Sequence, residues 1–188
     1  MPDLVWPKID EIAFHGLAGR YVKKIAPYTE ADPKGILVHF FLAYGNAIGR
    51  KAHFSFSGDA HYAADFATII DDTGFGRKNM AWKAARWIFC HAATGWVENC
   101  IMPGGIGSGE ALIVRLSNPS EKRVFMLESE FSRLLRVARR DNSIVSQILR
   151  MGWEEDTLYN ATKKEVIVAS GYHLSLIPHI TPEELQRM

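Results

Sequence analysis

The segment ATIIDDTGFGRKNMAW, residues 67–82, constrains the fold of this chain more than any other stretch. A β-branched run at 68–70 leads into a turn rich in Asp and Gly, and Arg77 and Lys78 then precede a helical pattern. A strand, a glycine turn, a lysine and a helix make up a phosphate-binding loop, in which backbone N–H groups converge on the anion. The segment therefore favours either such a loop or a plain strand-to-helix turn with two solvated cations.

The spacing departs from the strict phosphate-loop pattern G-x-x-x-x-G-K-[ST]. With Gly76 as the second glycine, Asp71 falls at the first. Arg77 then falls at the lysine and Lys78 at the magnesium-binding hydroxyl. The carboxylates of Asp71 and Asp72 repel a polyphosphate unless a cation lies between them. We therefore expect weak nucleotide binding and still weaker hydrolysis.

Strands and helices alternate along the chain, which predicts an α/β fold with a mostly parallel sheet. We expect a helical N-terminal portion at 1–52 and an α/β core at 53–188, within one compact domain. The expected strands are 65–70, 122–130, 165–170 and 172–180, with a hairpin or edge strand at 53–62. The expected helices are 14–26, 33–48, 79–93, one capped by Ser108, and 131–143.

Capping signals fix two helix boundaries. Asp32 is an N-cap followed by Pro33 at the first helical position, and Gly49 closes that helix. Near the end of the sequence, Thr181 and Glu184 form a capping box. That helix stops after about two turns, from which we expect the core to be incomplete at its C-terminus. The apolar stripe expected on 33–48 consists of Ile36, Leu37, Phe40, Tyr44 and Ile48.

Composition excludes several classes of protein. The 188 residues carry a formal net charge of +1, so any nucleic-acid binding must come from a local patch. The two cysteines, Cys90 and Cys100, cannot form a disulfide framework, and neither belongs to a C-x-x-C zinc motif. No stretch approaches the roughly 18 apolar residues that span a bilayer. We expect a cytoplasmic protein without a membrane partner.

A buried strand at 122–130 ends in two acids, Glu128 and Glu130. Acids at this end of a strand suit magnesium binding or water activation beside a phosphate loop. Period-2 geometry puts both on one side, provided that the strand reaches Glu130. The alternative is that they mark the solvent-facing end of a core strand. A metal-nuclease motif is excluded, because no lysine stands two residues beyond Glu128.

The segment RLLRVARR predicts a helix with a basic face. That face consists of Arg133, Arg136 and Arg140, opposite Leu134, Val137 and Ala138. Such a face can contact a nucleic-acid backbone. Charged helix faces are also commonly just solvated, and the nearby acids offer partners for these arginines. Both interpretations stay open.

Taken in order, these motifs resemble a poorly characterised family of bacterial, plasmid and phage proteins with a RecA-like P-loop core, described as primase–helicase-like. The resemblance runs from about residue 14 to 185, and no single motif is specific. The matching stretches are EADP at 30–33, GNAIGR at 45–50, HF at 53–54, HY at 61–62, DTGFGRK at 72–78 with Trp82, GIGSGEALI at 105–113, ESEF at 128–131, LR at 135–136 and HLSLIPHIT at 173–181.

The resemblance implies a three-layer RecA-like α/β core that binds ATP and Mg²⁺ and works in replication of mobile elements. The implied partner is single-stranded nucleic acid, with the chain's own copies or a replication or host protein as further partners. The resemblance makes 71–80 the phosphate loop. Its implied nucleotide-binding residues are Thr73, Gly74, Gly76, Arg77, Lys78 and Asn79. It makes Glu128 and Glu130 the acids, with Mg²⁺ on Glu128. His179 is the implied sensor of the γ-phosphate.

The departures from the family's pattern lie at the residues that would bind the nucleotide or act on it. Asp71 replaces a glycine, Phe75 a lysine and Pro178 a glycine beside the sensor, and 79–81 reads Asn-Met-Ala where the family has Gly-Thr-Ser. Two functions therefore remain open, beside the possibility of a fragment with no activity of its own. One is an ATP-binding module related to replicative primase–helicases that contacts single-stranded DNA. The other is a catalytically degenerate adaptor or inhibitor that binds nucleic acid or protein.

Overall fold

A computed structural model describes residues 9–71, 77–161 and 166–188, and its centre is a parallel four-stranded sheet. The order across the sheet is β3-β8-β5-β4, and every neighbouring pair is parallel. The mostly parallel α/β fold expected from the sequence is confirmed in this form. The strands are β3 (Ile69–Ile70), β4 (Ile101–Met102), β5 (Arg123–Glu128) and β8 (His173–Ile180).

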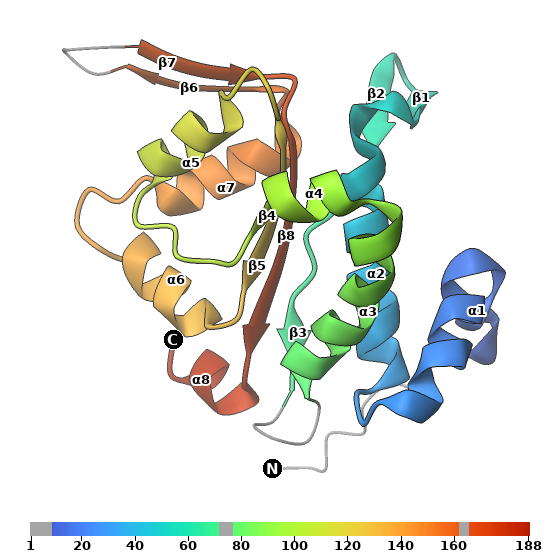
Figure 1. The fold of residues 1–188 in the computed structure, drawn as a ribbon. Helices are drawn as coiled ribbons and strands as arrows, with labels where there is room; N and C mark the ends of the chain where they lie inside the picture. Colours follow the sequence, from blue (N-terminus) through green and yellow to red (C-terminus); the bar gives the residue numbers. More distant parts are fainter. Residues whose placement is uncertain (1–8, 72–76, 162–165) are drawn as a thin grey trace.

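Helices pack on both faces of the sheet (Figure 1). One face carries α2 (Pro33–Ile48), α3 (Lys78–Ala92) and α4 (Thr94–Asn99), and α1 (Gly16–Ile25) packs against α2. The opposite face carries α5 (Gly109–Leu116), α6 (Phe131–Ala138) and α7 (Val145–Glu154), and α8 (Pro182–Gln186) follows β8. Three short 3-10 turns, η1 (Glu11–Phe14), η2 (Ala26–Tyr28) and η3 (Gly49–Lys51), flank the first two helices.

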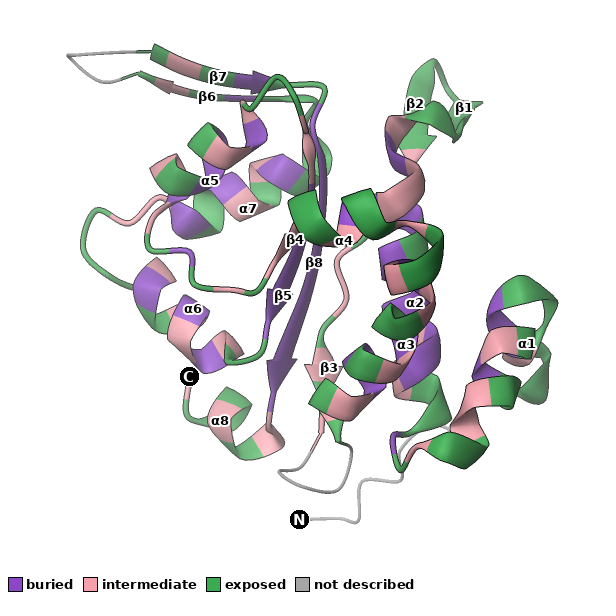
Figure 2. Ribbon diagram, viewed as in Figure 1, coloured by how far each residue is buried: buried purple, intermediate pink, exposed green. Residues whose placement is uncertain are grey.

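The two layers of helices give the sheet two apolar faces, and β5 shows the pattern. Its Phe125 and Leu127 belong to the core on the side of α2–α4, whereas Val124 and Met126 belong to the core on the side of α5–α7. All four side chains are buried, so β5 is a continuous apolar run rather than an alternating one. Figure 2 shows β5 and β8 buried along nearly their whole length.

The capping signals are confirmed. The Asp32 carboxylate accepts a hydrogen bond from Lys34 N at 2.8 Å, and Gly49 ends α2 at φ +62°. Ser108 caps α5, and Thr181 forms a capping box with Glu184. The expected apolar stripe of α2 is wrong in its last part: Tyr44 is 45% exposed, and the buried face continues through Ala43 and Asn46 instead.

Three expected elements differ from the structure. The strand at 65–70 is not buried: β3 has two residues at the sheet edge, and only Phe66 adds an isolated bridge to Leu176. Residues 166–170 form β7 (Val166–Ser170), which pairs antiparallel with β6 (Thr157–Ala161) in a separate hairpin. The helix at 131–143 ends at Ala138. The hairpin expected at 53–62 is confirmed as β1 (His53–Phe56) and β2 (Asp59–Tyr62).

Candidate functional site

Three adjacent strands end together at one edge of the sheet, and the main sequence candidates lie there. In the register, Ile70 stands opposite Ile180 and Glu128 opposite Pro178. Neighbouring strands are about 4.8 Å apart, so the ends of β3 and β5 are separated by about 10 Å, with β8 between them. In parallel α/β sheets, ligands bind outside this carboxyl edge.

Lys78 begins α3 and reaches back to the end of β3. Its Nζ donates a hydrogen bond to the carbonyl oxygen of Asp71 at 2.5 Å. The preceding residue, Arg77, has φ +45° and pairs with Glu30, so the two cations have different partners. Asn79 is exposed. Of the other expected phosphate-loop residues, Thr73, Gly74 and Gly76 lie outside the described residues.

Glu128 is the buried acid of the site, only 2% exposed at the end of β5. Its carboxylate accepts hydrogen bonds from Gly105 N at 3.2 Å and Glu130 N at 3.3 Å, and pairs with Arg133 at 3.3 Å. Gly104 has φ +71°, and a Cβ there would lie 2.9 Å from both carboxylate oxygens, so a side chain at this position would force Glu128 to shift. The glycine-rich loop at 103–109 therefore serves as a cradle for Glu128.

Glu130 does not share this position. β5 ends at Glu128, and Glu130 is the exposed residue before α6. The strand stops two residues before Glu130, so the condition under which both acids would project from one side of it is not met. Only the backbone N–H of Glu130 contributes to the cradle.

The three arginines do not form one continuous helical face. Arg133 is half-exposed and pairs with Glu128. Arg136 is exposed in the last turn of α6, but Arg140 lies beyond the end of that helix. Leu134 and Val137 are buried as expected. The basic face is thus split between the candidate site and the segment after α6.

His179 is 1% exposed, and its Nε2 lies 2.9 Å from Nε2 of His39 on α2. The Nδ1 of His39 contacts the carbonyl oxygen of Gly35 at 2.6 Å. Burial lowers the pKa of His39 to about 4, and the hydrogen bond to Gly35 opposes this shift. Burial also lowers the pKa of His179 to about 3, with contributions from the nearby positive charges of His39 and Lys78.

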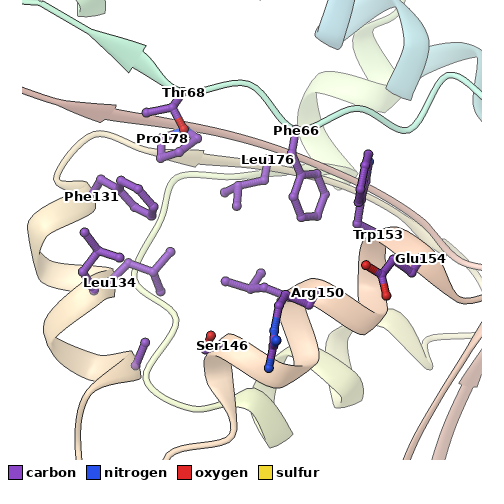
Figure 3. Close-up of a pocket in the computed structure, with 13 residues that line it drawn as sticks. Phe66, Thr68, Phe131, Leu134, Ser146, Arg150, Trp153, Glu154, Leu176 and Pro178 are labelled. Carbon is purple, nitrogen blue, oxygen red and sulfur yellow. The ribbon is translucent and has the colours of Figure 1, made fainter. Parts of the chain in front are cut away.

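Two hollows flank the strand ends. One, of about 420 Å³, lies beside β3 and is lined by Lys34, Asp71 and Lys78 among others, a volume typical of ligand pockets. The other, also about 420 Å³, lies between β8 and helices α6 and α7 (Figure 3). Apolar side chains such as Phe66, Leu134 and Leu176 line it, so it does not suit a polyphosphate.

Sequence reasoning missed His39, Gly104 and Gly105. No periodicity connects His39 with His179, which is 140 residues away. A signal did exist for the two glycines: consecutive glycines before a capped helix indicate a backbone that must approach another group closely.

Among the described residues, no group of three or more His, Cys, Asp or Glu is placed to hold a metal ion, and no helix is long and apolar enough to cross a membrane. Comparisons of the chain with models of protein families, with curated proteins and with solved structures found no match.

Proposed function

We propose that this protein binds Mg²⁺–ATP at the carboxyl edge of β3, β8 and β5. The observation that carries the proposal is the order of the side chains across that edge: Lys78 beside β3, His179 on β8 and Glu128 on β5. A RecA-like core, as the resemblance implies it, has its sensor at a strand end next to the phosphate loop. The order β3-β8-β5-β4 supports such a core.

In this proposal Lys78 supplies the positive charge for the phosphates. Its ammonium group now rests on a backbone carbonyl, a neutral acceptor that a phosphate oxygen can replace with a charge-assisted bond. Mg²⁺ commonly uses one or two carboxylates together with phosphate oxygens and waters, so the single buried carboxylate of Glu128 fits that role. Arg133 is within reach of the same carboxylate.

The test is calorimetric titration of Mg²⁺–ATP into the protein and into Lys78→Ala. We expect micromolar affinity that falls by about 10- to 100-fold in the variant, because a charge-assisted hydrogen bond contributes about 1.5–3 kcal/mol. Lys83→Ala is the matched control, since Lys83 is an exposed lysine on the same helix. Equal affinity in the two variants, or no heat with the unsubstituted protein, would refute a phosphate site at Lys78.

The wider proposal is a module related to primase–helicases of mobile elements, which contacts single-stranded DNA through arginines such as Arg136 and Arg140. Both are exposed, which leaves them accessible to a phosphate backbone.

The ion pair between Arg133 and Glu128 favours a second candidate, a non-hydrolysing adaptor or inhibitor that binds nucleic acid or protein. An acid neutralised by an arginine is a weaker ligand for Mg²⁺ and a weaker acceptor for water. If the adaptor proposal is right, Lys78→Ala should bind an oligonucleotide as tightly as the unsubstituted protein does, and ATP should make no difference.

A further inference from the structure

The hydrogen bonds around His39 determine which of its ring nitrogens carries the proton. A carbonyl oxygen can only accept, so the contact of His39 Nδ1 with Gly35 O requires a proton on Nδ1. A neutral imidazole holds one such proton, and the low pKa of His39 keeps the ring neutral near pH 7. Its Nε2 therefore carries a lone pair.

The same reasoning applies to the ring of His179. The two Nε2 atoms are 2.9 Å apart, and one of them must donate. Because Nε2 of His39 carries a lone pair, His179 must donate through its own Nε2. The remaining nitrogen of His179, Nδ1, is left as an acceptor, and it is buried without a partner among the described residues.

This tautomer limits what His179 can do beside a nucleotide. Phosphate oxygens at neutral pH are acceptors, so a lone pair on Nδ1 cannot bond to them and would repel them. A water molecule or a hydroxyl can donate to it. His179 precedes the last residue of β8, and the charge of Lys78 acts on its ring. Because Nδ1 is shielded from solvent, the donor has to be enclosed beside the ring.

We propose that His39 is a positioning residue that fixes the tautomer of His179, so that Nδ1 of His179 is held as an acceptor for an enclosed water near the end of β8. The role in water binding rests on the proposed nucleotide function. The tautomer itself does not, since it follows from contacts within the protein alone. His179 is then a water-binding group rather than a direct sensor of phosphate oxygens.

Nitrogen-15 NMR of the imidazole rings at neutral pH tests the relay. We expect protonated, pyrrole-type signals for Nδ1 of His39 and Nε2 of His179, and an unprotonated, pyridine-type signal for Nδ1 of His179. In His39→Leu, the His179 signals should move toward a mixture of tautomers. His173 is the internal control: its Nε2 contacts Gly45 O at 3.2 Å, so its Nε2–H tautomer should stay unchanged in the variant.

The spectrum of the unsubstituted protein tests the tautomers of His39 and His179 even if His39→Leu does not fold. A protonated Nδ1 on His179 would overturn the relay, as would an unchanged tautomer in a folded His39→Leu protein. Adding Mg²⁺ and a non-hydrolysable ATP analogue gives the second readout. We expect Nδ1 of His179 to stay unprotonated, and a pyrrole-type signal there would overturn the water-binding role. Failure of the analogue to bind would refute the proposed function and leave the tautomer assignment standing.

Discussion

Lowering the pH from about 7.5 to about 5 is expected to reduce the free energy of unfolding by about 4 kcal/mol, through His39 and His179. Both histidines titrate near 6.5 in the unfolded chain. In the folded protein burial holds the pKa of His39 at about 4 and that of His179 at about 3. Between these values and pH 6.5 the unfolded state binds more protons, so stability falls as the pH falls. Above pH 6.5 the contribution is constant.

The magnitude follows from linkage. Each histidine contributes about 1.4 kcal/mol for every pH unit below 6.5, which is about 2 kcal/mol at pH 5. That loss is a large part of the 5–15 kcal/mol that stabilises a typical domain. Burial also lowers the pKa of His173, so His173 adds to the loss of stability as the pH falls.

Urea unfolding at the two pH values measures this effect. A His39→Leu/His179→Leu double variant should have a clearly flatter pH dependence, whereas the exposed His91→Leu variant should behave like the unsubstituted protein. Equal free energies of unfolding at about pH 7.5 and about pH 5 would show that the two rings are not buried in neutral form.

Replacing Asn46 with alanine is expected to destabilise the protein by about 3 kcal/mol. Asn46 is fully buried on α2, and its amide nitrogen donates to Val124 O and His173 O at 3.0 and 3.2 Å. Its Oδ1 accepts from the indole N–H of Trp96 at 2.9 Å. The substitution leaves buried polar groups without partners and opens a cavity, and each of these adds to the cost.

Asn99→Ala is the matched control for this measurement. Asn99 is exposed, and its side-chain amide donates within its own helix, to Gly95 O. Its backbone carbonyl accepts from Arg115, and alanine keeps that bond. We expect that variant to lose less than about 0.5 kcal/mol in urea unfolding. Similar losses in the two variants would mean that Asn46 does not hold α2 and α4 against the sheet.

Local chemistry made parts of the fold predictable. Asp32, Ser108 and Thr181 each mark a helix start through a side-chain bond to a nearby backbone N–H, which depends on only a few neighbouring residues. The apolar run at β5 likewise predicted a buried strand. By contrast, Ile69 and Ile70 are as apolar as a core strand, and their place at the sheet edge depends on the order of the strands.

The candidate site was predictable only in part. Lys78, Glu128 and His179 could be named because each stands at the end of a strand or the start of a helix. The environments of these side chains could not be predicted, because their partners come from distant segments. Gly105 is a partner of Glu128, and His39 is the partner of His179. The place of Glu130 depended on the strand boundary, which a sequence pattern does not fix to within two residues: β5 ends at Glu128, and Glu130 is exposed.

The most direct test of the central claim is to locate the nucleotide with a paramagnetic ion. Mn²⁺ can replace Mg²⁺ with ATP, and it broadens the NMR signals of nearby amides in proportion to the inverse sixth power of distance. Binding at the carboxyl edge should broaden the amide signals of Lys78, Gly105 and Glu130 first. Signals of β1 and β2 should stay sharp, because that hairpin lies at the opposite end of the sheet (Figure 1). Broadening centred on the hairpin, or none that depends on ATP, would contradict a nucleotide site at this edge.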